Sequence, residues 1–160
     1  MFEKKIENKN LRKLGRAADM LWLSIGEPIM IDWYKGGKRE VSEYAIHFQC
    51  PWRFVKNGEI LLAAHDIYNP FNENAGKDWE WDIFGREKEE SSIFDVRSQE
   101  LSELLPLKIK SVNSTDTSDL HIDFENGICF DTFMAHSRKS EFFRFLDNTS
   151  DEQIVIFDVD

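Results

Sequence analysis

Residues 44–64 read YAIHFQCPWRFVKNGEILLAA and contain two apolar runs joined by a turn. In the first run apolar side chains occupy every second position, which is the period of a β-strand because successive strand residues point to opposite faces. This apolar series comprises Tyr44, Ile46, Phe48, Cys50, Trp52 and Phe54. The other face is mixed and includes His47, Gln49 and Arg53. The pattern predicts a strand that turns its even-numbered side chains toward the core.

A hairpin turn is predicted at the Asn-Gly pair of residues 57–58, because both residue types tolerate positive φ angles. A three-residue loop with a glycine bulge would pair Val55 with Glu59 and place Cys50 opposite Ala64. The second run would then turn its apolar side chains to the core face, namely Ile60, Leu62 and Ala64. We favour this register, since a one-residue slip would move every side chain to the other face.

A two-residue loop is the alternative register for the same hairpin. It would pair Lys56 with Glu59 and place Cys50 opposite His65. The core face would then carry Leu61, Ala63 and His65, which is a less apolar set.

Length and composition bound the class of protein. The chain has 160 residues, for which we expect one domain spanning residues 1–160, and its 13 Phe and 5 Trp favour a packed core over disorder. The formal net charge of −10 disfavours nucleic acid and anionic membrane as partners and permits a basic protein partner. An N-terminus without an apolar leader, no apolar stretch of membrane-spanning length and only two cysteines predict a reduced, cytoplasmic protein.

Further apolar runs of strand length predict an α+β fold that is mainly antiparallel β. They cover residues 20–25, 29–34, 107–112, 120–124, 128–132 and 154–159, with 140–146 as a strand or a short helix. We expect residues 1–10 to be a frayed lead-in or an edge strand and residues 26–28 to form a turn. A helix is predicted over residues 95–105, where Asp95 can cap the first turn and Pro106 ends the helix. The whole predicts a strongly bent or two-layer sheet of about six to nine strands.

Two segments, residues 20–65 and 107–146, share an order of strand, turn, strand, polar loop and third apolar run. In both, a Ser-Glu-aromatic triplet opens the third run, at Ser42 and at Ser140. A duplicated three-strand meander would account for this order, and chance similarity between alternating strands is the alternative.

Residues 66–92 form a long polar stretch that also carries aromatic side chains, namely Tyr68, Phe71, Trp79, Trp81 and Phe84. Loops of this length are uncommon unless they are functional, disordered or packed by their own side chains. The aromatic content argues against disorder. We therefore expect either a packed loop that covers a sheet face or a binding lip.

Acids alternate with indoles inside this stretch, in the order Asp78, Trp79, Glu80, Trp81 and Asp82. An extended chain would place the acids on one side and the indoles on the other. We interpret the pattern as an acidic rim above two anchoring tryptophans, which suits a basic partner. Carboxylates beside aromatic rings are also typical of sugar sites, which is the alternative interpretation.

Cysteine-hydrolase chemistry would need Cys50 exposed and within hydrogen-bond reach of His47 or His65. His47 points to the opposite face in a regular strand, and His65 lies opposite Cys50 only in the less favoured register. We therefore predict a packed thiol and no catalytic residue.

Metal chemistry is not indicated by the spacing of ligand-type residues. The candidate ligands are His47, His65, Asp66, His121 and His136. They form no His-Glu-x-x-His motif, no paired Cys-x-x-Cys motif and no calcium loop. The sequence therefore predicts neither a metal site nor a cofactor.

Arg53 is flanked by Trp52 and Phe54, so we expect a partly buried guanidinium in an ion pair or in a stack. A clamp for an anion or ligand is the alternative role. A cavity between the sheet and the aromatic loop would use Arg53, His65 and Asp66 as its polar groups.

Several segments resemble a family of small bacterial proteins to which no activity is assigned. They are GRAADMLWLSIGE, YAIHFQCPWRF and DIYNPF, followed by SIFDVRSQEL and by the pattern from DLHIDFENG to FFRFL, and they extend over most of the chain. Where the family is expected to have Trp-Arg-Phe near its C-terminus, this chain has Phe143-Arg144-Phe145. The resemblance implies a bacterial cytoplasmic protein of the toxin-immunity or accessory kind and brings no site residues.

Taken together, the sequence favours a non-enzymatic cytoplasmic protein that binds another protein, with immunity against a basic toxin as its sharpest form. The candidate binding residues are Arg53, His65, Asp66, Trp79, Glu80, Trp81 and Asp82. One alternative is a small-molecule binder or hydrolase with a cavity near His65, Asp66 and Arg53. Another is a homodimer formed through a sheet edge or through the tryptophan loop.

Overall fold

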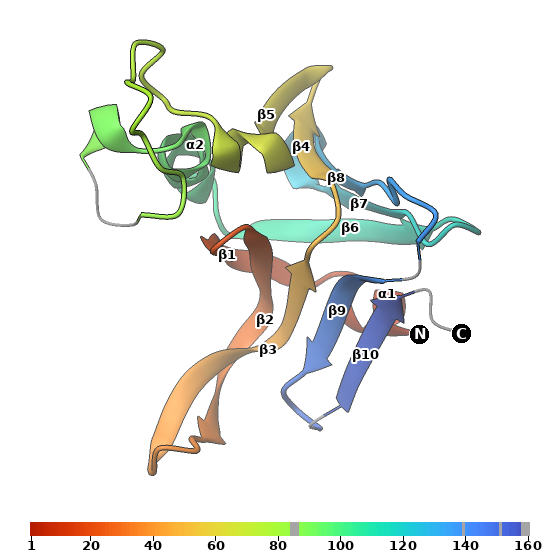
Figure 1. The fold of residues 1–160 in the computed structure, drawn as a ribbon. Helices are drawn as coiled ribbons and strands as arrows, with labels where there is room; N and C mark the ends of the chain where they lie inside the picture. The colour runs from red at the N-terminus through yellow and green to blue at the C-terminus, as the bar shows by residue number, and fades with distance from the viewer. Residues whose placement is uncertain (84–86, 139, 151, 158–160) are drawn as a thin grey trace.

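The structure is a computed structural model that describes residues 1–83, 87–138, 140–150 and 152–157. Over these residues the chain forms one antiparallel sheet of ten strands in the order β10-β9-β3-β2-β1-β6-β7-β8-β4-β5 (Figure 1). The strands are β1 (Asn10–Ala17), β2 (Met20–Asp32), β3 (Lys38–Phe48), β4 (Trp52–Lys56), β5 (Glu59–Ala63), β6 (Leu107–Ser114), β7 (Leu120–Phe124), β8 (Ile128–Thr132), β9 (Glu141–Asp147) and β10 (Glu152–Phe157). The helices are α1 (Phe2–Ile6) and α2 (Ile93–Ser102), with short 3-10 segments η1 (Ala64–Tyr68), η2 (Lys88–Glu90) and η3 (Glu125–Gly127). The predicted α+β class, mainly antiparallel β, is confirmed.

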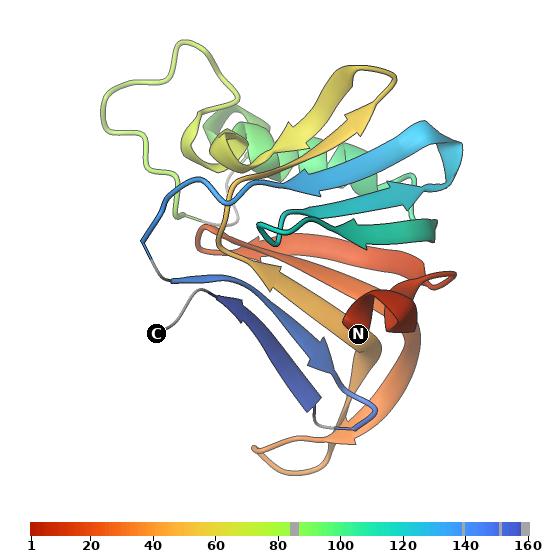
Figure 2. The same cartoon turned by 90° about the vertical axis from the view of Figure 1, so that its right-hand side faces the viewer.

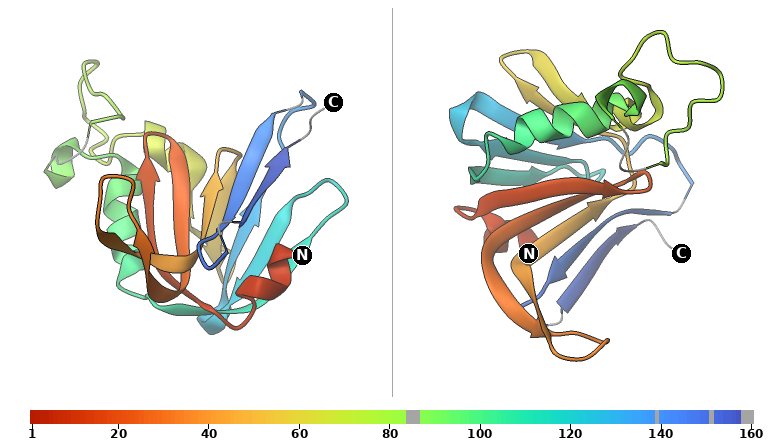
Figure 3. Two further views of the ribbon diagram at one scale, coloured as in Figure 1. Left: turned by 90° about the horizontal axis from the view of Figure 1, so that it is seen from below. Right: turned by 90° about the vertical axis from the view of Figure 1, so that its left-hand side faces the viewer.

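The sheet bends sharply between β1 and β6, which are joined by two residue pairs, Asn10 with Lys108 and Leu11 with Leu107. Five strands lie on each side of this line in the strand order, and the sheet curves around the core (Figure 2 and Figure 3). The two halves meet through aromatic rings. Phe48 of β3 lies 5.0 Å from Phe130 of β8, measured between ring centroids. Because the strands on either side of the bend share one core, the bent or two-layer arrangement that the sequence predicts is also confirmed.

The stretch at residues 44–64 supplies two strands before the turn rather than one. β3 ends at Phe48 and β4 begins at Trp52, so residues 49–51 carry the chain from one half of the sheet to the other. The alternation survives this break, and the even-numbered side chains from 46 to 54 are all buried, with Tyr44 half-buried. Pro51, which has no N–H to give to a ladder, lies at the crossing. The predicted inward face is therefore confirmed although the single strand is not.

The favoured three-residue loop in the β4–β5 hairpin is wrong. Lys56 pairs with Glu59 across a two-residue turn, in which Asn57 has φ 51° and Gly58 has φ 80°. The register then shifts between Val55, which faces Ile60, and Phe54, which faces Leu62. This bulge brings Leu62 to the buried face and leaves Ile60 47% exposed, whereas the prediction had both side chains inward.

Residues 20–32 form one long strand, β2, where two strands and a turn were expected over residues 20–34. The Gly26–Glu27 region is a bulge in β2, and pairing with β3 resumes at Pro28 opposite Ser42. Gly26 has φ 90°, and the Glu27 backbone N–H donates to Oε1 of Glu43 at 2.8 Å. The first of the two similar segments thus has one strand where the second has two, β7 and β8.

The N-terminus is neither a frayed lead-in nor an edge strand. Residues 2–6 form α1, which contacts β6 and buries Phe2 and Ile6. The Phe2 ring lies 5.0 Å from the Phe145 ring of β9. The spacing of the two apolar residues, four apart on one helix face, lets α1 cover the core between β6 and β9.

Helix α2 begins two residues before the predicted start, and it ends at Ser102, three residues before the predicted end. Its cap is Ser92, whose Oγ accepts a hydrogen bond from the Asp95 backbone N–H at 3.1 Å. The expected cap, Asp95, is instead an ion-pair partner of β1. Phe94 packs on the inward face of the sheet, 5.9 Å from the Trp52 ring, so α2 covers the core beside β5 and β1.

The C-terminal half follows the predicted strands closely. Residues 107–112 lie in β6, and the β7–β8 hairpin pairs Ile122 with Phe130 around the three-residue η3, as expected. Residues 141–147 form β9, which decides the choice between strand and helix. The terminal strand is β10, and the last two predicted positions, 158 and 159, lie outside the described residues. None of the described helices is long and apolar enough to cross a membrane.

Candidate functional site

Cys50 is packed in the core, as the alternation predicts. Its side chain is 5% exposed, and burial raises the pKa of its thiol to about 12. His47, on the outward face of β3, faces Arg144 of β9. A thiol with this pKa holds almost no thiolate at neutral pH, which is the form that attacks a substrate. The geometry gives Cys50 a packing role.

A pocket of about 260 Å³ lies next to Cys50, and His65 and Tyr68 are among its lining residues. Of the three predicted cavity groups, only His65 lines it. Asp66 accepts the Ala63 backbone N–H at 2.8 Å and so stabilises the start of η1. The guanidinium of Arg53 is exposed and lies over the Phe133 ring, 5.1 Å from its centroid. The three residues therefore do not converge on one pocket. Arg53 is stacked on a ring, which is one of its predicted roles, but the predicted partial burial is wrong.

The loop over residues 66–92 is held by its aromatic side chains. Trp81 is half-buried against the core and makes an edge contact with Tyr68, 5.0 Å between ring centroids. The Trp79 indole N–H donates to the Glu90 carbonyl at 2.7 Å. The acids that alternate with these indoles, Asp78, Glu80 and Asp82, are all exposed. This arrangement matches the packed loop with an acidic rim; Phe84, the remaining aromatic residue, lies outside the described residues.

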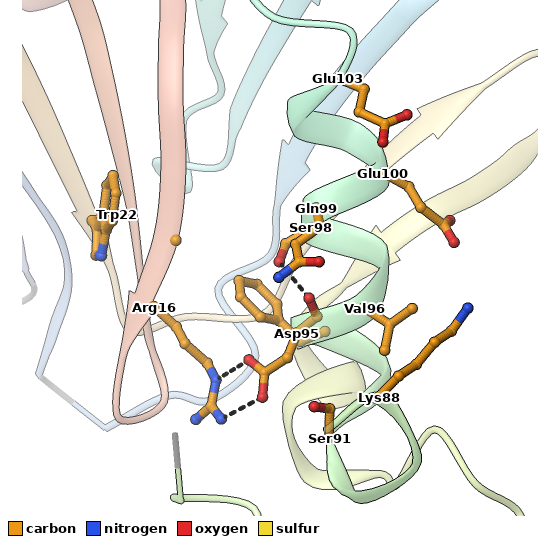
Figure 4. A pocket seen from close by; sticks show the side chains of 12 residues that line it. Arg16, Trp22, Lys88, Ser91, Asp95, Val96, Ser98, Gln99, Glu100 and Glu103 are labelled. Carbon is orange, nitrogen blue, oxygen red and sulfur yellow. Dashed lines mark hydrogen bonds and ion pairs between the residues drawn. The ribbon is translucent and has the colours of Figure 1, made fainter. Parts of the chain in front are cut away.

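A buried arginine connects this loop and α2 to the sheet (Figure 4). Nε and Nη2 of Arg16 donate to the two carboxylate oxygens of Asp95 at 2.9 and 3.0 Å. The same guanidinium donates to the backbone carbonyls of Ala18 and Trp81 at 2.9 and 2.7 Å. One side chain therefore positions β1, the β1–β2 turn, the loop and the helix relative to one another.

Negative charge is concentrated in this part of the chain. Residues 66–103 contain eleven acidic and four basic residues, a net charge of −7 out of −10 for the whole sequence. Most of these acids are exposed, including Glu100 on α2, Glu103 directly after α2 and Glu80 in the loop. A groove of about 500 Å³ runs between α2 and the β1–β2 pair, and Glu100 and Glu103 are among its lining residues (Figure 4). We call residues 66–103 the acidic unit.

A second group of polar side chains lies on the outward face of the β7–β8 hairpin, and the sequence reasoning missed it. It consists of His121 and Asp123 on β7 with Cys129 and Asp131 on β8. The signal was present as His-x-Asp and Cys-x-Asp on two strands that were already expected to pair. Motif searches for metal sites along the chain do not detect ligands that meet across strands.

Comparisons of the chain with protein-family models, with curated proteins and with solved structures found no match. The resemblance to a bacterial family therefore stays a prediction.

Proposed function

We propose that this chain binds a basic protein through the acidic unit. The observation that carries the proposal is the net charge of −7 within residues 66–103. A surface of one sign attracts a partner of the opposite sign over long range, raises the association rate and disfavours acidic competitors. The charge is spread over a helix and a loop, which together offer a broad surface rather than a closed pocket.

Preorganisation supports the same proposal. Arg16 and Trp81 fix the acidic unit to the sheet, so its carboxylates need little ordering when a partner binds. A fixed acidic surface is what an inhibitor of a basic enzyme or toxin needs. The sharpest form of the proposal is an immunity-like role against a basic toxin in a bacterial cytoplasm, and it rests on the charge and on the family resemblance.

The test compares two triple variants as baits in affinity capture followed by titration calorimetry of the captured protein. Glu80→Gln/Glu100→Gln/Glu103→Gln removes three exposed charges from the acidic unit. Glu40→Gln/Glu59→Gln/Glu125→Gln removes three exposed charges elsewhere and is the matched control. Exposed ion pairs contribute about 0.5 kcal/mol each, so the first variant should lose affinity about tenfold and the control should keep it.

The dependence of the affinity on salt concentration is a second test of the proposal. Because screening shortens the reach of charge to about 10 Å at 0.1 M salt, the affinity for a basic partner should fall steadily from 50 to 500 mM salt. A captured partner that is acidic, that binds both triple variants equally, or that binds independently of salt would overturn the proposal.

A further inference from the structure

The polar group on the β7–β8 hairpin forms a square of side chains. His121 pairs directly with Asp131, and Asp123 pairs directly with Cys129. Residues that are directly opposite in an antiparallel pair have Cβ atoms about 5 Å apart. The intervening residues Ile122 and Phe130 are buried, so the four polar side chains share the outward face.

The distances within the square are short. Nδ1 of His121 lies 2.5 Å from Oδ1 of Asp131, and Sγ of Cys129 lies 3.9 Å from the other oxygen of that carboxylate. Nε2 of His121 lies 3.1 Å from Oδ1 of Asp123. One ligand-type atom from each of His121, Cys129 and Asp131 lies within 4.8 Å of the other two. The site is reachable from solvent, since the His121 side chain is 40% exposed.

We propose that this square binds a divalent transition-metal ion of the Zn²⁺ class through His121, Cys129 and Asp131. Imidazole nitrogen, thiolate sulfur and carboxylate oxygen are the three donor types that Zn²⁺ uses in proteins. Neighbouring ligands of a tetrahedral Zn²⁺ lie about 3.4 Å apart, given bond lengths near 2.1 Å. Rotation of the side chains closes the remaining gap, while the strand pairing keeps the backbone in place.

Asp123 completes the site from outside the ligand set. With Nδ1 of His121 on the ion, the Nε2–H donates to Asp123, which is the usual carboxylate support of a metal-bound histidine. Asp123 is itself oriented by the Ser111 hydroxyl, which donates to Oδ2 at 3.1 Å. The same strand pairing that builds the square therefore also provides its second layer of hydrogen bonds.

Charge balance agrees with a divalent cation. Binding requires the Cys129 thiol and Nδ1 of His121 both to give up a proton to solvent, so the site then holds one thiolate, one neutral imidazole and two carboxylates. The ion contributes two positive charges, and Arg53, which lies directly opposite Asp131 on β4, contributes a third. The bound site is therefore neutral. Without an ion, His121 lies between the carboxylates of Asp123 and Asp131, and the Cys129 thiol donates a long hydrogen bond to the second oxygen of Asp131.

The test measures metal binding directly on the full chain after treatment with a chelator. Zn²⁺ is titrated by competition with a chromophoric chelator, and Co²⁺ is added separately to look for a thiolate-to-cobalt charge-transfer band. We expect one ion per chain and the cobalt band. Cys129→Ser should abolish the band, and both Cys129→Ser and His121→Asn should weaken Zn²⁺ binding by more than about 100-fold. Asp123→Asn, which removes only the support, should weaken it by about 10- to 100-fold.

His65→Asn is the matched control, because His65 is also an exposed histidine but lies on η1. It should bind Zn²⁺ as the parent chain does. Absence of stoichiometric binding at micromolar Zn²⁺ would overturn the proposal, as would binding that survives both His121→Asn and Cys129→Ser. Thermal unfolding recorded on each variant without metal shows whether the fold is retained. The readout needs no protein partner, so it is independent of the proposed function.

Discussion

The carboxylate of Asp95 receives two hydrogen bonds from the guanidinium of Arg16, at 2.9 and 3.0 Å, across 79 positions of sequence. The Arg16 side chain is 2% exposed, and that of Asp95 is 26% exposed. A buried charge that loses its partner is left in a medium that solvates it poorly. The main effect of this pair on stability is therefore that it prevents the buried Arg16 guanidinium from being left without a counter-charge.

Replacing Asp95 with Ala should destabilise the fold by about 3 kcal/mol. This is the low end of the range of stability losses for breaking a buried ion pair, and we expect it because Asp95 is partly solvated. Urea unfolding of the two chains measures the difference. Asp32→Ala is the control, since Asp32 and Lys38 form a pair that is largely exposed, and its unfolding midpoint should stay unchanged. A change of less than 1 kcal/mol for Asp95→Ala would show that the partners left to the arginine, which include the Ala18 and Trp81 carbonyls, satisfy its charge.

Gly26 has a φ of 90°, and a Cβ there would lie 2.8 Å from Oε1 of Glu43. Gly26→Ala should therefore destabilise the chain by about 2 kcal/mol, because an L-residue is strained at this φ and Glu43 would lose its bond to Glu27. Gly76→Ala is the matched control, since nothing lies within 4 Å of a Cβ at that position. Thermal unfolding should separate the two variants, and equal midpoints would mean that the bulge relaxes without cost.

Periodicity predicted the core because a period of two is local information. The side chains of Ile46 to Phe54 keep their alternation even where β3 passes into β4, so the inward face could be predicted without knowledge of the break. The bulge at Gly26 could not be predicted, because a Gly-Glu-Pro sequence is equally typical of a turn. α1 was missed since five residues are too few for a helical pattern, and its formation depends on packing against β9.

The candidate sites depend on contacts between distant segments to different degrees. The acidic rim was predicted from the alternation in residues 78–82, whereas its attachment through Arg16 depends on a contact with Asp95 that no local pattern encodes. The β7–β8 square could have been predicted from the sequence, because the expected pairing of Ile122 with Phe130 already places His121 opposite Asp131. The four residues form no motif along the chain, because they come together only when the two strands pair.

The register of the β4–β5 hairpin can be tested by two truncations. In the structure Leu62 is buried and Ile60 is 47% exposed, whereas the three-residue loop would bury both. Leu62→Ala should cost about 3 kcal/mol because it leaves a cavity, and Ile60→Ala should change stability by less than about 0.5 kcal/mol. Urea unfolding measures both, and a large loss for Ile60→Ala would favour the rejected register.

His47 should make the fold less stable as the pH falls. Burial, followed by the nearby charge of Arg144, lowers the pKa of His47 in the folded state. The pKa of His47 is about 6.5 in the unfolded chain and lower in the folded chain, so between these two pKa values the unfolded chain binds more protons. The stabilising contribution of a neutral His47 is therefore complete above pH 6.5 and declines as the pH falls below it. His121, whose pKa is raised by its hydrogen bond with Asp131, acts in the opposite direction.

Comparing the parent chain with His47→Gln at each pH removes the contribution of His121, which is common to both. Urea midpoints at pH 7.5 and 5.5, in the presence of a chelator, should fall further for the parent chain than for His47→Gln. Parallel declines would show that His47 is as easily protonated in the folded chain as in the unfolded one.

The two cysteines should differ in reactivity toward iodoacetamide, which attacks the thiolate. With a pKa of about 12, the Cys50 thiol is ionised to only about 10⁻⁴ at pH 8, and its side chain is also 5% exposed. Cys129 is half-buried, and burial with the neighbouring Asp131 raises the pKa of its thiol more modestly. Mass spectrometry of the folded chain with chelator should therefore show one slow adduct at Cys129, and urea should expose both thiols. The Cys129→Ser chain should stay unmodified until it is unfolded; rapid modification of that folded variant would mean that Cys50 is accessible and would remove the reason for treating it as an inert core residue.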